Sequence, residues 1–247
     1  MRRPFAVRCS SAAPEGLLEV RIELAKALTP ELAERAERTG RRFFELANAG
    51  ALCGDAIAPD ASGIGGSKLS AAGSHVDWLF SDVKIDPLSA TVALNLIEAF
   101  HENWCAVRSV YLGWNLLNDV DNPSQFLFPK IATPLPFAFS YDPDASAFDV
   151  IVDFAGPQSE AQLELINETL GQWLRGVALG AYGDENSRPA INRIDFLPEA
   201  PCTLESDSLM WSIESFNSTP HALAGMVNVV SRIHRTLAPV RSLEIGE

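Results

Sequence analysis

Apolar and polar residues alternate along short stretches of the first half of the chain, and longer stretches repeat an apolar residue every three or four positions. Residues 18–24 carry an apolar side chain at every second position, which is the pattern of a half-buried strand. Residues 53–74 are instead rich in Gly, Ala and Ser and give little strand signal. The elements expected in this half are a strand at 18–24, a helix from Thr29 and Pro30 to about Gly50, a strand at 76–83, a helix at 87–104 and a strand at 107–112.

The second half shows the same order of patterns. Val150 to Phe154 alternate as a strand does, and Pro157 stands where the first turn of a helix would begin. Apolar residues then follow at helical spacing as far as Gly183, which we expect to end the helix. The remaining elements expected here are strands at 191–197 and 210–216, a helix from Thr219 and Pro220 to about Thr236, and a strand at 240–245.

An internal repeat links the two halves. Residues 78–113 align with 211–246 without a gap, at an offset of 133, and eight of the 36 positions are identical. Average residue usage would give about two identities by chance. The identical pairs are Trp78/Trp211, Pro87/Pro220, Asn95/Asn228, His101/His234, Val107/Val240, Arg108/Arg241, Ser109/Ser242 and Gly113/Gly246. The sequence therefore predicts an α+β protein made by internal duplication of a ferredoxin-like β-α-β-β-α-β unit, with the two units packed together.

The expected domain boundaries follow from this repeat. The first ferredoxin-like unit covers 15–114 and the second covers 146–247. Between them, residues 115–145 form an acidic connection rich in proline and aromatic residues, about 30 residues long. Apolar residues alternate between Leu135 and Tyr141, so this connection is either an extra hairpin packed across the units or a strap whose aromatic residues meet a partner. Packing is favoured, because exposed aromatic side chains are unfavourable unless something covers them.

Composition and charge narrow the class of protein. Hydrophobic residues make up 47% of the 247 residues and charged residues 21%, which excludes a disordered chain. The 19 Lys and Arg against 32 Asp and Glu give a net charge of −13, which disfavours binding to nucleic acid or to a membrane surface and suits a basic partner or simple solubility. No stretch of 18 apolar residues occurs, and the apolar run at 4–7 is too short for a secretion signal. A cytoplasmic location is expected.

Candidate motifs for chemistry fail on their spacing. The four cysteines are scattered without a CxxC pair, and Gly63 to Lys68 lacks the order of a phosphate-binding loop. His101 and His234 occupy equivalent places near helix ends, where a structural role is expected. We expect no catalytic residues, no metal ion and no cofactor, which favours a protein that is not an enzyme.

Two functions of different classes remain. The first is a non-catalytic, acidic inhibitor or immunity-type protein that binds a basic protein, for example a nuclease toxin. The contact surface expected for that partner is acidic and consists of Asp119, Asp121, Asp142, Asp144, Asp184 and Glu185.

The alternative is a small-molecule-binding protein or an enzyme. In this case the two sheets would pack face to face around an apolar pocket between the repeats. The residues expected at that pocket are Trp78, Trp211, Asp77 and Glu214, although both tryptophans are also typical core residues. An exposed sheet edge could in addition pair with another copy of the chain, so the oligomeric state stays open.

Overall fold

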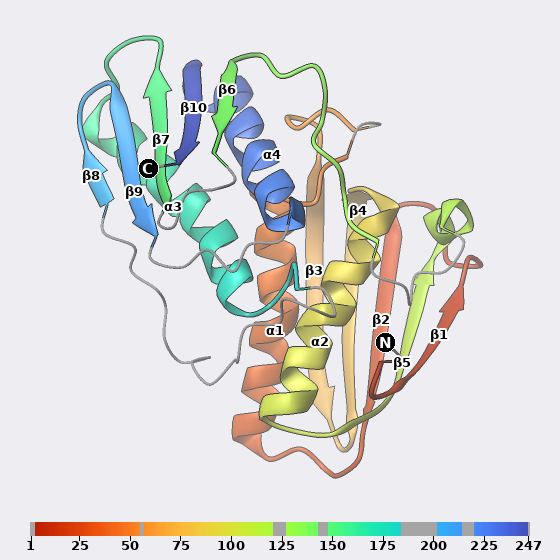
Figure 1. The fold of residues 1–247 in the computed structure, drawn as a ribbon. Coiled ribbons are helices and arrows are strands. Elements are labelled where there is room, and N and C mark those ends of the chain that lie inside the picture. The colour runs from red at the N-terminus through yellow and green to blue at the C-terminus, as the bar shows by residue number, and fades with distance from the viewer. Residues whose placement is uncertain are drawn as a thin grey trace.

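The computed structural model has a mixed α+β architecture (Figure 1). It describes residues 3–54, 57–120, 127–142, 148–183, 202–213 and 220–246. Within these residues there are two five-stranded sheets, four α-helices and two short 3-10 helices. None of the helices in these ranges is long and apolar enough to cross a membrane.

The first sheet has the strand order β1-β5-β2-β4-β3. All of its neighbouring strands are antiparallel except β1 and β5, which run parallel. Its strands are β1 (Ala6–Ser10), β2 (Leu17–Leu24), β3 (Gly63–Ala72), β4 (His75–Lys84) and β5 (Val107–Trp114). Its helices are α1 (Pro30–Asn48) and α2 (Ala90–Asn103), with η1 (Pro87–Ser89) just before α2 and η2 (Asn115–Asp119) after β5.

The second sheet repeats this arrangement, with the strand order β6-β10-β7-β9-β8. Its first strand is again an edge strand that runs parallel to the last strand, β10. Its strands are β6 (Ala138–Tyr141), β7 (Phe148–Phe154), β8 (Cys202–Leu204), β9 (Ser208–Ile213) and β10 (Val240–Gly246). Its helices are α3 (Glu160–Ala178) and α4 (Pro220–Thr236). The strand expected at 191–197 lies outside the described residues.

Local sequence explains where the helices begin and end. The side chain of Thr29 caps α1 by accepting from the backbone N–H of Leu32, and Ser159 caps α3 in a capping box. The chain turns after α1 at Gly50, with φ +85°, and after α3 at Gly180, with φ +73°. Both values lie in the left-handed region that favours glycine. The expectation that α3 continues to Gly183 is therefore wrong by about one turn.

The helices lie between the two sheets, so the order of layers is sheet, helices, helices, sheet (Figure 1). In β2 the buried residues Leu18, Val20, Ile22 and Leu24 face the helices, and the alternate positions, among them Glu19, Arg21 and Glu23, face outward. None of the helices in the described ranges covers the outward face of either sheet. The face-to-face packing of the sheets, on which the expected pocket between the repeats depended, is not found.

The two halves meet through close helix packing and two buried asparagines. A Cβ atom at Gly176 of α3 would lie 2.7 Å from Leu46 of α1, so the two helices cross where there is no room for a side chain. The amide of Asn95 donates to the carbonyls of Ala181 and Gly183, both at 3.0 Å. These contacts tie α2 of the first half to the segment that follows α3 in the second.

Asn228 on α4 of the second half, the repeat equivalent of Asn95, bonds a segment of the first half and the connection. Its amide nitrogen donates to the carbonyls of Cys53 at 3.0 Å and Lys130 at 2.9 Å, and its oxygen accepts from the N–H of Ala132 at 2.9 Å. It is fully buried. Segments from both halves and from the connection are therefore held by one side chain.

The two histidines have the same structural role. Nδ1 of His101 accepts from the N–H of Val107 at 2.9 Å, and Nδ1 of His234 accepts from the N–H of Val240 at 3.0 Å. Each imidazole thus joins the end of a helix to the first residue of the next strand. The helix-end position expected from the sequence is confirmed, and the ring nitrogen acts there as a hydrogen-bond acceptor.

Candidate functional site

The structure describes only part of the predicted partner-binding surface. Asp142 follows β6 and is exposed, and its N–H continues the sheet by donating to the carbonyl of Ile245 at 2.8 Å. Asp119 is the last residue of η2. The other four residues of that prediction lie outside the described ranges: Asp121, Asp144, Asp184 and Glu185.

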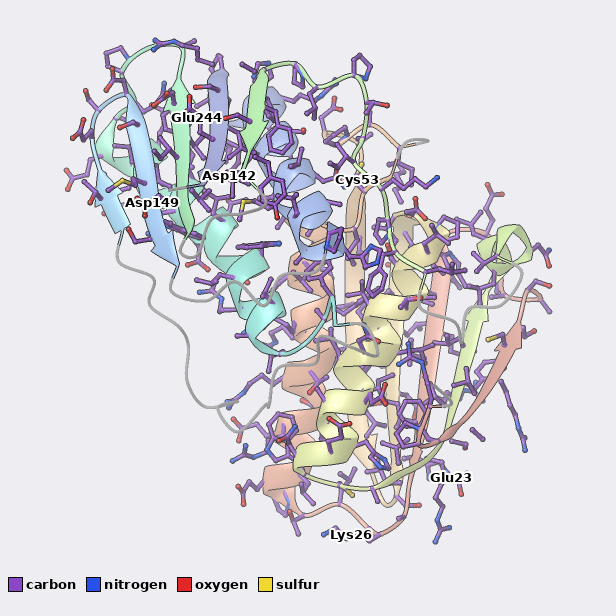
Figure 2. The ribbon with its side chains drawn as sticks, in the orientation of Figure 1. Glu23, Lys26, Cys53, Asp142, Asp149 and Glu244 are labelled. Atoms are coloured by element: carbon purple, nitrogen blue, oxygen red, sulfur yellow. The ribbon has the colours of Figure 1, made fainter. Side chains whose placement is uncertain are left out.

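Asp142 belongs to a cluster of carboxylates on the outward face of the second sheet. Asp149 and Asp153 lie on β7, and Glu244 lies on the adjacent β10. Asp142, Asp149 and Glu244 are labelled in Figure 2. A Cβ at Gly246, which pairs with Asp149, would lie only 3.1 Å from the Cβ of Asp142, so the cluster runs across three strands. We refer to Asp142, Asp149, Asp153 and Glu244 as the acidic face.

Hydroxyl groups orient two of these carboxylates. Ser212 on β9 donates to Asp149 at 2.7 Å, and Ser242 on β10 donates to Asp153 at 2.9 Å. Within the part of the chain that the structure describes, Asp149, Asp153 and Glu244 form no ion pair. The paired outward positions of β7 and β10 include no basic residue; they are Asp149, Ile151, Asp153, Ser242, Glu244 and Gly246. One exposed basic residue of β10, Arg241, lies outside these pairs at the bulge beside Ser242. The negative charge of this face is therefore not neutralised from within these pairs.

The outward face of the first sheet is different because it contains Arg21. This guanidinium bonds Glu19 and lies 3.8 Å from a carboxylate oxygen of Asp77. It also lies over the ring of Tyr111, 5.8 Å from the centroid. The bond to Glu19 is the main cause that raises the pKa of Arg21 above its ordinary value. Glu19 and Asp77 on this sheet therefore have a cation between them.

Of the residues expected at a ligand pocket, Trp78 and Trp211 lie in different halves of the structure. Trp78 is buried on the inner face of β4, directly beneath Gly40 of α1, where a Cβ atom would lie 2.7 Å from the indole ring. Trp211 is buried on β9, and its Nε1 donates to Asn167 of α3 at 2.8 Å. Each tryptophan thus packs beneath a helix of its own half. Asp77 is exposed beside Arg21, and Glu214 lies outside the described residues.

No metal cluster is found among the described residues, and the thiol of Cys53 is not reactive. No group of three or more His, Cys, Asp or Glu side chains in these ranges could hold a metal ion. Cys53 is buried and its thiol donates to the carbonyl of Ile57. Burial raises the pKa of Cys53 to about 11, so the thiol is protonated at neutral pH and is a poor nucleophile.

Three residues of the acidic face were missed at the sequence level, although one signal for them was present. The alternation from Phe148 to Phe154 places Asp149 and Asp153 on the same face of one strand. Glu244 joins them only through the pairing of β10 with β7, which the order of residues along the chain does not reveal.

Comparison with known proteins gives no family. No family profile matches the chain, and no curated protein does so either. Among solved structures, a crystal structure of pitrilysin aligns with 90% of this chain at 8% sequence identity and a TM-score of 0.19. The chain spans 37% of the length of that pitrilysin chain. A similarity at this level supports no conclusion about fold or function.

Proposed function

We propose that this chain is a non-catalytic protein-binding protein, an inhibitor or immunity-type partner of a basic protein such as a nuclease toxin. The observation that carries this proposal is the acidic face, where four carboxylates gather on one sheet and the register pairs of β7 and β10 contain no basic residue. The exposed Arg241 stands outside these pairs, at the bulge of β10 beside Ser242. A protein surface of this kind attracts a cationic partner and increases the rate of encounter.

The local geometry favours protein recognition over general solubility. Serine hydroxyls hold Asp149 and Asp153 in fixed orientations, so these side chains lose little conformational freedom when a partner binds. The carboxylates lie on a hydrogen-bonded sheet, which is a rigid support. The net charge of −13 adds a long-range attraction for any basic protein.

We also propose that the chain arose by internal duplication of a ferredoxin-like β-α-β-β-α-β unit. In each sheet, the last strand of the proposed unit pairs with its first, and the first pairs with its third, as such a unit requires. Both copies add one parallel edge strand before the unit, β1 in the first and β6 in the second. Ala6 pairs with Ser109 and Ala138 pairs with Ser242, so even the register of the added strand agrees.

Residue-level contacts support the duplication. The triplet Pro-Phe-Ala occurs at residues 4–6 and again at 136–138. Phe5 packs against His101 with ring centroids 5.9 Å apart, and Phe137 packs against His234 at 6.1 Å. A second repeat that includes β6 would begin inside the connection at 115–145, earlier than residue 146.

The outward faces of the two sheets differ in charge at their centre. Arg21 on β2 has Ile151 as its counterpart on β7, at the offset of 130 that relates these two strands. Loss of the arginine leaves the carboxylates of the second sheet without a cation at the centre of the same face. We propose a cytoplasmic location as well, supported by the free thiols of Cys53 and Cys105 in the core.

The proposal is tested by reversing charge on the acidic face. Asp149→Lys with Glu244→Lys changes the net charge from −13 to −9, since each replacement adds two positive charges. The control, Glu15→Lys with Glu164→Lys, makes the same change at exposed positions of other segments. The immobilised protein is used to capture its partner from host lysate, and the purified pair is then measured by surface plasmon resonance at increasing NaCl.

We expect a basic partner whose association rate falls about tenfold or more with the acidic-face variant and much less with the control. The salt dependence of binding should also become flatter for the acidic-face variant. Equal effects of both double variants would mean that only the overall charge matters. Capture of no basic protein at stoichiometric amounts would overturn the proposal.

A further inference from the structure

The outer edge of β3 presents backbone groups that β4 does not pair. Among the described residues, β4 is the only strand beside β3. The turn at Gly73 and Ser74 makes Ala72 and His75 a hydrogen-bonded pair, and every second residue from there toward Gly66 bonds β4 in the same way. The residues between them point their N–H and C=O groups away from β4; they are Ser67, Leu69 and Ala71.

These six backbone groups are open to a further strand. Within the described ranges, no hydrogen bond to any of them is present. The start of the edge is closed, because the N–H of Ile64 donates to the side chain of Asn48 on α1 at 2.9 Å. The open stretch is therefore 66–72. The exposed side chains in it are those of Ser67, Lys68, Ser70 and Ala72.

This edge is also the longest and the least protected of the described edges. β3 has ten residues, whereas β1 has five, β6 has four and β8 has three. Proteins usually protect a long edge with proline, a bulge or several charged residues. The stretch 66–72 contains no proline, pairs with β4 in a continuous register and carries one charge, on Lys68. Such an edge accepts an added strand.

We propose that two copies of this chain pair through β3, antiparallel and about a two-fold axis at Leu69. Ser67 of one copy then pairs with Ala71 of the other, and Leu69 pairs with its own equivalent. The three pairs exchange six backbone hydrogen bonds and join the two five-stranded first sheets into one continuous sheet. The two Leu69 side chains, each packed on the core of its own copy, lie side by side on the inner face.

Charge complementarity favours a second copy as the occupant. In the two-fold register, Lys68 of the second copy lies opposite Ser70, and Ser70 lies opposite Asp77 of β4. Lys68 and Asp77 are thus about 10 Å apart at the backbone, two strand spacings of ~4.8 Å, which their side chains can span. The two-fold axis creates this pair twice and places no like charges directly opposite each other.

Both members of this charge pair can form it. Lys68 is exposed and has no ion pair within the part of the chain that the structure describes. Asp77 is 53% exposed and lies 3.8 Å from Arg21, which is too far for a hydrogen bond, while Arg21 bonds Glu19. The oxygens of Asp77 can therefore still accept hydrogen bonds from a lysine.

The dimer is independent of the acidic face, because the two share no residue. The net charge of −13 on each copy opposes self-association, so the dimer should become tighter as NaCl screens the repulsion. Binding of a basic partner to the acidic face should instead become weaker with NaCl. The opposite salt dependence means that either proposal can fail without the other.

Sedimentation equilibrium of the full chain tests the association. A small edge contact should give a Kd on the order of 10 µM. Lys68→Glu should raise the Kd about tenfold or more, because it faces a carboxylate across the interface. Arg8→Glu makes the same charge change at an exposed position of β1, the opposite edge of the same sheet, and should leave the Kd nearly unchanged. Lys68→Glu with Asp77→Lys should restore association.

Amide hydrogen exchange followed by ¹H–¹⁵N NMR locates the interface. Exchange at Ser67, Leu69 and Ala71 should slow about fivefold or more between dilute and concentrated protein. The amides of Lys68 and Ser70 already bond β4, so their exchange should be slow at both concentrations.

Several results would overturn this self-pairing. They are a chain that stays monomeric up to about 500 µM, a dimer in which those three amides gain no protection, and equal effects of Lys68→Glu and Arg8→Glu. Protection of the same amides by a different captured protein, with no dimer, would also overturn it, because the edge would then serve another partner.

Discussion

Replacement of Asn228 by alanine should lower the free energy of unfolding by about 3 kcal/mol or more. The side chain is fully buried and makes three hydrogen bonds, to the carbonyls of Cys53 and Lys130 and from the N–H of Ala132. Alanine leaves these three backbone groups without their partner. A buried polar group that loses its hydrogen bond costs about 1–3 kcal/mol, and three such groups at the lower limit give the stated value.

The matched control is Asn103→Ala. Asn103 also donates one hydrogen bond from its amide, at 2.8 Å to the carbonyl of Ala99, but this contact lies within the last turn of α2 and is only partly buried. We expect a loss of about 1 kcal/mol or less for this variant. The difference between the two variants isolates the cost of breaking contacts that join distant segments from the cost of removing an asparagine.

Urea denaturation followed by circular dichroism and by tryptophan fluorescence measures both variants. The midpoint should fall for Asn228→Ala, and the melting temperature should decrease by about 6–12 °C, from about 2–4 °C per kcal/mol for a chain of this size. Because the side chain links the two halves, its loss should also separate the transitions seen by the two probes. A loss no larger than that of Asn103→Ala would refute the reasoning.

Two further predictions concern helix packing and the buried thiol. Gly176→Ala should destabilise the protein by about 1–3 kcal/mol, because the added Cβ would lie 2.7 Å from Leu46. Gly171→Ala on the same helix, where the nearest neighbour of the added Cβ is at 3.5 Å, should stabilise it by up to about 1 kcal/mol. Thermal unfolding should therefore show a lower melting temperature for the first variant and an unchanged or higher one for the second. The native thiol of Cys53 keeps its proton up to about pH 11, whereas the unfolded thiol loses it near pH 9, so the free energy of unfolding should fall between pH 9 and 11. Urea midpoints over this range should fall less steeply in Cys53→Ala, and identical slopes would contradict the raised pKa.

The elements with strong periodicity could be predicted from the sequence. The alternating residues of β2 and the Thr29-Pro30 start of α1 were identified within one residue. In these segments, burial of one face selects the residue pattern directly. The residue pattern of such an element is enough to predict it, because its inner face packs against apolar neighbours.

Edge strands could be predicted only in part: the alternation between Leu135 and Tyr141 indicated a strand where β6 lies, but not its pairing with β10, and β1 and β3 gave no such signal. β3 consists largely of Gly, Ser and Ala, and only Ile64 is buried in it, so it has no apolar alternation. β1 and β6 are short and pair in parallel with the last strand of each half. Their formation depends on a partner about 100 residues away in the chain, and local periodicity does not record such pairing.

The acidic face could also not be predicted from the sequence, for a related reason. Asp142, Asp149 and Glu244 come together only through the pairing of β6, β10 and β7. Likewise, Arg232 at the end of α4 bonds the carbonyls of Pro59 and Ser62 in the loop after α1, about 170 residues away in the chain. Sites made from distant segments are determined by topology, and a single sequence without its pairings does not specify that topology.

The position of the helices between the sheets has a consequence for how this protein can change over generations. The contacts that keep the halves together, such as those of Asn95 and Asn228, all lie on the inner side of the sheets. Outward residues such as Glu19 and Glu244 take no part in them, and exchanges at surface positions usually alter stability by less than about 0.5 kcal/mol. The residues that maintain the fold and the residues available for recognition are therefore separate sets. Substitutions in the outward residues can change binding specificity without lowering the stability of the fold.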